Sequence, residues 1–568
     1  MFVRLFFVTA GAALALEFCG TPAYAVTGTA VTEAARDLGP ASASVRVDVA
    51  LVLKYHHRTE LDRLVEAQAA PGNALFHHFL TPSQFEAYFA PTSAEYERVA
   101  STLIRAGFTV THEFGNRTVL DASASAPVAA RFFKTDIHRV ITQDGETAYS
   151  NVRPPVVPAG IASLVAVVAG LDAAGRFHPV SSLTSKRTAL PPGPQLASNG
   201  PPLYGPNGGY GPQIYIGAYD LPAPNGFTGT GRTTGVAGDA DYLDSDLDTY
   251  LSYFEVARTG PPTVRVPVDG GPRQGLTHDS SETTLDVETI VGLAPGTALY
   301  LYLAPYSMTN ANFIDIDNTV VNDNIVDTLN TSYVYCESRL NKKIPGYAEA
   351  VDAIVEQGSA QGITFHSASG DNGSSQFGCP GRVSISTPTD LPHNVSIGGT
   401  ALEVERASGR ETSEVGWDDG FGAGGGGVSV IFPVPSYQEN VPNIIPGGRN
   451  VPDLAFSASE LEGAAFYFDN YFAGSEGGTS LASPIFGAAL TEINQLQGSR
   501  SGYFNVTLYD LWLTHGYGTG STASFRDITL GSIPPYGAGP GYDQMTGIGS
   551  LQAKNFAALV CAPAHRAC

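Results

Sequence analysis

The sequence predicts a doubly wound parallel α/β domain preceded by a smaller α+β domain. The chain has 568 residues, more than one ordinary hydrophobic core accommodates. Short apolar runs alternate with helical patterns after residue 213, which is typical of βαβ units around a buried parallel sheet. Residues 186–212 are rich in Pro and Gly and lack periodicity, as an exposed linker does. We therefore expect a first domain over 26–185, this linker, and a main domain over 213–568.

Residues 1–25 have the features of a secretory signal peptide. Arg4 supplies the positive charge, LFFVTAGAALAL the apolar run, and Ala23-Tyr24-Ala25 a cleavage site between small residues. The apolar run is short for a membrane span, and no later segment reaches about 20 uninterrupted apolar residues. We expect cleavage after Ala25 and a secreted, extracellular protein.

The charge of the chain excludes two classes of partner. Its net charge is −23 and its pI about 4.8, so it should repel nucleic acid and anionic membranes. With only 31 Lys and Arg, a fall in pH first reduces the net charge, which favours a protein that tolerates acid.

Four cysteines remain once Cys19 leaves with the signal peptide. Four cysteines allow three pairings, of which we favour Cys336–Cys379 with Cys561–Cys568, in keeping with an oxidising compartment. No Cys/His spacing typical of a metal site is present.

The first domain combines two helical patterns, LDRLVEAQAA and PTSAEYERVASTLIRAG, with short β-like runs such as FTVTHEF. This mixture predicts a small α+β domain. Its paired histidines, at 56–57 and 77–78, are interpreted as structural or surface residues.

The main domain follows as alternating strands and helices. Expected strands are TTGVAG (233–238), ALYLYLA (298–304), NIVDTLNTSYVY (324–335) and ITFHSAS (363–369). Expected helices are DSDLDTYLSYF (244–254), SSETTLDVETIVGL (280–293) and GYAEAVDAIVEQGSAQG (346–362). In such sheets, functional residues lie at the carboxyl ends of the strands.

Ser480 is the candidate nucleophile. It lies in GSEGGTSLASPIFGAAL, where a glycine-rich turn leads into an apolar helical run. Unpaired backbone N–H groups gather at a helix N-terminus and can bind an oxyanion. A plain helix cap is the commoner use of such a serine, but it does not account for GGTS followed by LASP. The string resembles the nucleophile segment of subtilisin-like serine peptidases.

Carboxylates take the place of the histidine base expected for such a serine. No histidine after the linker lies in a subtilisin-type helix start, and only His278 is kept as an alternative base. Glu282 and Asp286 are spaced i, i+4, on one helix face. A solvated acidic face is the simpler interpretation, but the apolar residues around and after Asp286 (Leu285, Val287, Ile290, Val291 and Leu293) predict a mostly buried helix. Burial would raise a pKa and let the pair share a proton. Glu288 faces elsewhere on the helix.

Asp371 is the third candidate carboxylate. It follows the strand 363–369 through Gly370, at the sheet edge where an active site belongs. An Asx-turn would also explain it. A carboxyl held protonated would instead donate a hydrogen bond to an oxyanion.

These segments together resemble the serine-carboxyl peptidase family of sedolisin and kumamolisin. ETTLD, SASGDNG and GGTSLASP match family motifs, and FHHFLTPSQF with the helix after it resembles the family's activation domain. The resemblance implies a subtilisin-like fold with Ser480 as nucleophile, Glu282 as general base, Asp286 as its orienting partner and Asp371 as oxyanion donor. One departure is Val334 in NTSYVYCE, where the family usually has glycine.

The end of the chain carries a candidate calcium site. FRDITLG and GPGYD supply the carboxylates of Asp527 and Asp543, and carbonyls from Ile528, Gly539 and Gly541. Oxygen ligands of this kind suit Ca²⁺, although a Gly/Asp turn is the default for either piece alone. The pair resembles the family's calcium site, which implies one structural Ca²⁺.

The sequence is thus interpreted as a secreted, acid-acting serine endopeptidase made as a proenzyme. Its first domain would inhibit the enzyme until the linker is cut, its substrates would be proteins or peptides, and the processed form would be monomeric. Two alternatives stay open: a tripeptidyl exopeptidase of the same family, and a secreted scaffold or binding protein without activity.

Overall fold

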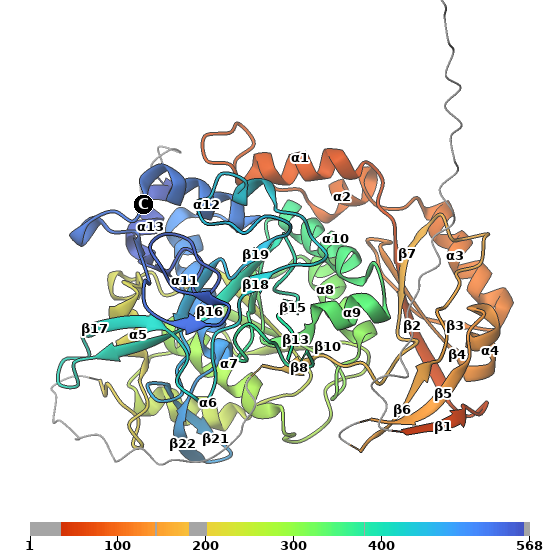
Figure 1. Ribbon diagram of the computed structural model, residues 1–568, viewed down its shortest axis with the longest axis horizontal. Coiled ribbons are helices and arrows are strands. Elements are labelled where there is room, and N and C mark those ends of the chain that lie inside the picture. Colours follow the sequence, from red (N-terminus) through yellow and green to blue (C-terminus); the bar gives the residue numbers. More distant parts are fainter. Residues whose placement is uncertain (1–35, 143–144, 181–200, 380, 562–568) are drawn as a thin grey trace, which may run out of the picture.

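The computed structural model describes residues 36–142, 145–180, 201–379 and 381–561. The expected signal peptide and most of the expected linker lie outside these ranges. Figure 1 shows an N-terminal unit (residues 36–180, red to orange) packed beside a larger main unit (residues 201–561). No helix within the described ranges is long and apolar enough to cross a membrane.

The N-terminal unit is an α+β structure, as predicted. An antiparallel sheet of order β3-β4-β2-β7 forms its centre, beside a smaller sheet of order β1-β5-β6. The strands of the central sheet are β2 (Arg46–Leu53), β3 (Thr109–Glu113), β4 (Val119–Ser125) and β7 (Val165–Ala169). The smaller sheet contains β1 (Arg36–Pro40), β5 (Ile137–Ile141) and β6 (Thr147–Asn151).

Helix ends in this unit follow from local sequence. Helix α3 (Ser93–Ala106) begins with a capping box between Thr92 and Glu95 and ends at Gly107, whose φ of 99° suits a residue without Cβ. The other helices are α1 (Arg58–Ala69), α2 (Pro82–Tyr88) and α4 (Ala126–Phe132). Helix α1 extends from the N-terminal unit over α10 (Tyr347–Ala360) and α12 (Phe504–His515) of the main unit (Figure 1).

The main unit contains the predicted parallel sheet. Its order is β10-β11-β9-β12-β14-β16-β17, and β20 also pairs with β16. All of these pairs are parallel except β16–β17. The strands are β9 (Thr233–Gly238), β10 (Val264–Pro267), β11 (Ala298–Leu303), β12 (Thr328–Thr331), β14 (Thr364–Ala368), β16 (Asn394–Val404), β17 (Glu411–Gly416) and β20 (Leu454–Ser457).

Helices cover both faces of this sheet. Leu329 and Phe365 belong to the core that α8 (Asn310–Asp323) and α10 share with the N-terminal unit. The next residues along the strands, Asn330 and His366, bond instead to Ser483 of α11 (Thr479–Gln497). Because successive strand residues point to opposite faces, α8 and α10 lie on one side of the sheet and α11 on the other. Helix α7 (Ser280–Leu293) packs against α11.

One predicted strand is divided into two. The expected strand at 324–335 breaks at Ser332, and β13 (Tyr333–Cys336) leaves the main sheet. It pairs antiparallel with β15 (Ser386–Thr387) and with β8 (His178–Pro179), the last strand of the N-terminal unit.

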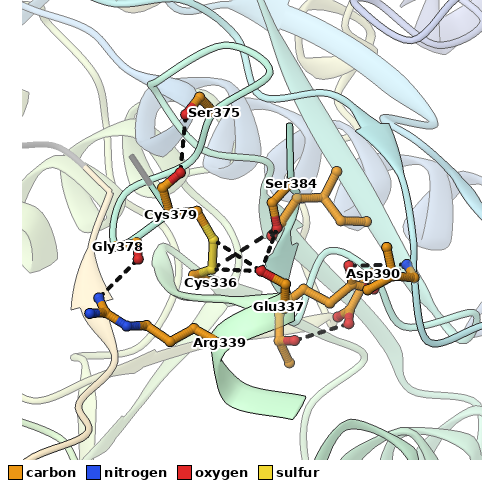
Figure 2. Close-up of a disulfide and its surroundings, with 12 residues drawn as sticks. Cys336, Glu337, Arg339, Ser375, Gly378, Cys379, Ser384 and Asp390 are labelled. Atoms are coloured by element: carbon orange, nitrogen blue, oxygen red, sulfur yellow. Dashed lines mark hydrogen bonds between the residues drawn. A yellow bond between two sulfur atoms is a disulfide. The ribbon is translucent and has the colours of Figure 1, made fainter. Parts of the chain in front are cut away.

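The predicted disulfide between Cys336 and Cys379 is present. It joins the end of β13 to the loop after β14, with the two Cα atoms 5.8 Å apart (Figure 2). Arg339 on α9 (Glu337–Lys343) donates to the Gly378 carbonyl at 2.9 Å beside it. The end of β13 and the loop after β14 are thereby held together. Cys568, the predicted partner of Cys561, lies outside the described residues.

Candidate active site

Ser480 is the second residue of α11 and is fully buried. Gly478 precedes the helix with a φ of 87°, a conformation that favours glycine. Among the described residues, the Ser480 Oγ has no hydrogen-bond partner. A buried hydroxyl at a helix N-terminus, left without a partner, is available to a bound substrate.

Asp371 lies directly beside the start of this helix. Its Oδ1 accepts hydrogen bonds from Thr479 N at 2.7 Å and Thr479 Oγ1 at 2.8 Å. A Cβ on Gly478 would lie 2.5 Å from Asp371 Oδ2, so this close approach requires glycine. Burial raises the pKa of Asp371 to about 8, and the bonds from Thr479 only partly oppose that rise. The carboxyl is therefore protonated in acid.

Glu282 and Asp286 lie on α7 and are each 1% exposed. Burial, followed by repulsion from Glu282, holds the pKa of Asp286 well above its usual value. The charge of Glu282 also contributes to the raised pKa of Asp371, after burial as the main cause. Glu282 thus lies near enough to Asp371 for its charge to act there, and α7 packs against α11.

A chain of hydrogen bonds fixes α7 against α11. Ser332 Oγ donates to Asp286 Oδ1 at 2.9 Å, and Asn330 Nδ2 donates to Ser332 Oγ at 3.4 Å. Ser483 Oγ in turn donates to Asn330 Oδ1 at 2.7 Å. Because Ser483 lies on the same helix as Ser480, this chain of bonds sets the position of Asp286 relative to Ser480.

The histidines of the main unit have other surroundings. His366 shares a 3.0 Å hydrogen bond with Ser483, and burial lowers its pKa to about 3, which keeps the ring neutral. His278, the alternative base, is a surface residue whose side chain is 66% exposed and contacts Asp279. His278 therefore lacks burial, and His366, although buried beside α11, bonds to Ser483 and not to Ser480.

Glu288 points away from this group, as predicted. Its Oε2 accepts a hydrogen bond from Tyr467 N of β21 (Ala464–Phe468) at 3.0 Å. It is as buried as Glu282 but belongs to another part of the core.

Asp239 is a buried carboxylate that the sequence analysis missed. It follows β9 and accepts hydrogen bonds from Tyr333 Oη at 2.8 Å and Ser307 N at 2.9 Å. Burial raises its pKa to about 6, and burial together with the charges of Asp239, Asp279 and Glu282 raises the pKa of Tyr333. Tyr333 thus lies near Asp239 and the carboxylates of α7. The sequence did contain a signal for Asp239, because an aspartate at the carboxyl end of a buried strand lies at the functional edge of a parallel sheet.

A cavity of about 440 Å³ lies beside β13, and its lining includes Val334, Asn372 and Phe377. The N-terminal unit reaches into the same region through Arg176 and His178. Its strand β8 places His178 opposite Val334, and Val180 N donates to the Ser332 carbonyl at 2.9 Å. The end of the N-terminal unit therefore lies along β13, beside the carboxylate site. Val334, the departure from the family pattern, packs against Val180 and Ala368.

The predicted calcium ligands lie together in the C-terminal loops. Asp527 accepts hydrogen bonds from Gly541 N at 3.2 and 3.1 Å, and Asp543 Oδ2 accepts one from Gly539 N at 2.9 Å. Thr546 Oγ1 lies 3.4 Å from the Ile528 carbonyl oxygen and 3.2 Å from both Asp543 carboxylate oxygens. The two carboxylates and the Ile528 carbonyl would offer a cation only oxygen ligands, the kind that Ca²⁺ prefers.

Comparison with known proteins identifies the family. Residues 33–174 match the model of the Pro-kumamolisin activation domain. Sedolisin from Pseudomonas sp. (strain 101) is 31% identical over 536 residues, which cover 90% of this chain and 86% of sedolisin. The chain belongs to the sedolisin family of serine-carboxyl peptidases. It is a proenzyme of that family, with its activation domain in the N-terminal unit.

The chain is also similar to other relatives and to a solved structure. Kumamolisin from Bacillus sp. (strain MN-32) is 31% identical over 544 residues, covering 90% of this chain and 91% of kumamolisin. Tripeptidyl-peptidase 1 from Bos taurus is 27% identical over 561 residues, covering 92% of each protein. The solved structure of Pseudomonas sedolisin, a serine-carboxyl proteinase complexed with two molecules of pseudo-iodotyrostatin, matches with a TM-score of 0.54 and 28% identity. That match covers 62% of this chain and 98% of the sedolisin chain, and it confirms the predicted fold.

Proposed function

We propose that this family member is a secreted, acid-acting endopeptidase that uses Ser480 as nucleophile and the Glu282–Asp286 pair as its base. The observation that carries this proposal is the surroundings of Ser480: a buried hydroxyl beside Asp371, with the carboxylates of α7 packed against the same helix. Secretion rests on the signal-like residues 1–25.

In the proposed mechanism, Ser480 Oγ attacks the peptide carbonyl while Glu282 takes the hydroxyl proton. Asp286 shares a proton with Glu282 and is held in place by Ser332. Glu282 then protonates the departing amine, and water attacks the acyl-enzyme with Glu282 again acting as base.

Asp371 would stabilise the tetrahedral intermediate. With its pKa raised to about 8 by burial, its carboxyl carries a proton in acid and donates it in a hydrogen bond to the oxyanion. The backbone N–H of Ser480, at the helix N-terminus, supplies a second donor. A neutral donor here limits the enzyme to conditions in which Asp371 remains protonated.

The pairing of β8 with β13 supports an endopeptidase. The activation domain places His178 and Pro179 along β13, with the rest of that domain preceding them in the chain. The region beside the proposed active site thus accommodates a chain that extends far on the N-terminal side of His178, whereas a tripeptidyl exopeptidase needs a cleft that is closed near the substrate N-terminus. The same pairing explains inhibition, because β8 occupies an edge that an extended substrate would use.

The exopeptidase alternative is favoured by the similarity to tripeptidyl-peptidase 1. Two internally quenched peptides of one sequence, one N-terminally acetylated and one free, separate the two modes. We expect both to be cleaved at similar rates and at internal bonds. Cleavage of the free peptide alone, with release of a tripeptide, would show an exopeptidase, and cleavage of neither would favour a scaffold.

We also propose one structural Ca²⁺ held by Asp527 and Asp543, with carbonyls from Ile528, Gly539 and Gly541. In the processed enzyme, chelation should lower the melting temperature by about 4 °C, because a cation present at about 100 times its Kd contributes about 2.7 kcal/mol. Asp527→Asn keeps a hydrogen-bond acceptor for Gly541 but removes the charge, so this variant should not respond to chelator. An unchanged melting temperature in the parent enzyme would refute the site.

A further inference from the structure

A second group of carboxylates lies where the activation domain meets the peptidase. Asp121 belongs to β4 of the activation domain, Asp315 to α8, and Asp269 to the turn after β10. One oxygen from each residue lies within 4.8 Å of the others. Residues from two domains therefore converge on one point outside the active site.

The hydrogen bonding of this group is incomplete. Asp121 is 7% exposed and Asp315 is 3% exposed. Among the described residues, no N–H or hydroxyl group donates to either carboxylate oxygen of Asp121 or to Asp315 Oδ1, so their only hydrogen-bond partners are the other carboxyls of the group. Burying an ionised carboxylate without a partner is costly, so the group needs a proton or a cation.

The third carboxylate, that of Asp269, can be reached from solvent. Asp269 is exposed, and its Oδ2 accepts a hydrogen bond from Asn312 Nδ2 of α8 at 2.7 Å. A cation could thus enter at Asp269 and contact the two buried carboxylates behind it.

The charges around the group do not neutralise it. Asp48 on β2 and His112 on β3 lie near Asp269, and no described ion pair joins a Lys or Arg to any of the three carboxylates.

Rigid elements position the three side chains. Asp121 lies in the centre of its sheet, paired with Ala50 of β2 and with His112 of β3. One turn along α8 from Asp315, Asn318 Oδ1 accepts hydrogen bonds from Asn116 Nδ2 at 2.9 Å and Thr118 Oγ1 at 2.8 Å. The two domains therefore bond directly to each other at this point. The three carboxylates are already close together, so no rearrangement is needed.

We propose that Asp121, Asp269 and Asp315 bind a divalent cation that fastens the activation domain to the peptidase. Carboxylate oxygens are the ligands of hard cations, and Ca–O distances of about 2.3–2.6 Å place opposite ligands about 5 Å apart, in keeping with this group. The cation would replace the missing hydrogen-bond donors. Because its ligands come from both domains, its binding energy would add to the stability of the proenzyme and be lost when the domains separate.

The test uses the full-length proenzyme with Ser480→Ala, confirmed intact by mass spectrometry, after removal of metal. Calorimetric titration with Ca²⁺ and separately with Mg²⁺ counts the sites. We expect Asp121→Asn to bind one cation fewer than its parent, and Asp527→Asn to lose a different one. Glu97→Gln, which removes an exposed carboxylate of α3, is the matched control and should bind as many as the parent.

Hydrogen exchange of the backbone amides shows which elements the cation stabilises. Chelation should speed exchange in β4 and α8 of the parent by about tenfold or more and leave Asp121→Asn unaffected. Should Asp121→Asn not fold, Asp269→Asn, at the exposed ligand, replaces it with the same expectations. If the aspartate variants bind as many cations as the parent, or if chelator leaves β4 unchanged, the carboxylates are held by shared protons and the proposal is wrong.

Discussion

Replacing Ser480 with alanine is expected to lower kcat by about 10⁴-fold or more, as loss of a nucleophile does in serine peptidases. The side chain is buried at the start of α11, and alanine there removes an Oγ that has no hydrogen-bond partner among the described residues. The variant should therefore fold as well as its parent. The measurement is the turnover of a fluorogenic peptide by protein whose activation domain has been removed by an added peptidase.

The matched control is Ser501→Ala. Ser501 is also buried, and its Oγ donates to Asn494 Oδ1 at 2.6 Å at the far end of the same helix. This control should lose some stability but keep its activity. Equal activity of Ser480→Ala and its parent would exclude the serine mechanism altogether.

The second large effect is expected from Glu282→Gln. Glutamine keeps the size of the side chain but cannot accept the Ser480 proton, so kcat/KM should fall by about 10²–10⁴-fold, the usual contribution of a general base. Glu288→Gln is the control, since Glu288 lies on the same helix, is equally buried, and bonds to Tyr467 instead. Kinetics of the two variants, measured at the same acidic pH, compare them directly. Equal losses in both would indicate damage to α7 rather than loss of a base.

The sequence was sufficient for the fold and for the carboxylates near Ser480. The spacing of Glu282 and Asp286 places them on one helix face, and an aspartate after a buried strand, such as Asp371, falls at the functional edge of a parallel sheet. These inferences depend on short-range patterns, which a single sequence displays.

Features that depend on long-range pairing were not predictable. The hydrogen bond from Tyr333 to Asp239 joins two segments far apart in the chain, so no short-range pattern predicts it. The strand β8 exists because β13 leaves the main sheet and exposes an edge, and the patterns at 324–335 do not reveal that break. The Asp121 group likewise needs the packing of two domains, since its members come from three separate parts of the chain.

The most direct test of the central claim, that Ser480 works with carboxylates rather than with histidine, is the pH dependence of kcat/KM for the processed enzyme. Asp371 has a raised pKa of about 8, so its donor form is present below that value and is lost as the pH rises through it. Burial and Glu282 likewise raise the pKa of Asp286, so the proton shared by the pair is retained in acid. We predict a maximum at acidic pH and a decline toward alkaline pH. A rate that rises through the neutral range to an alkaline plateau, as a histidine base produces, would contradict this account.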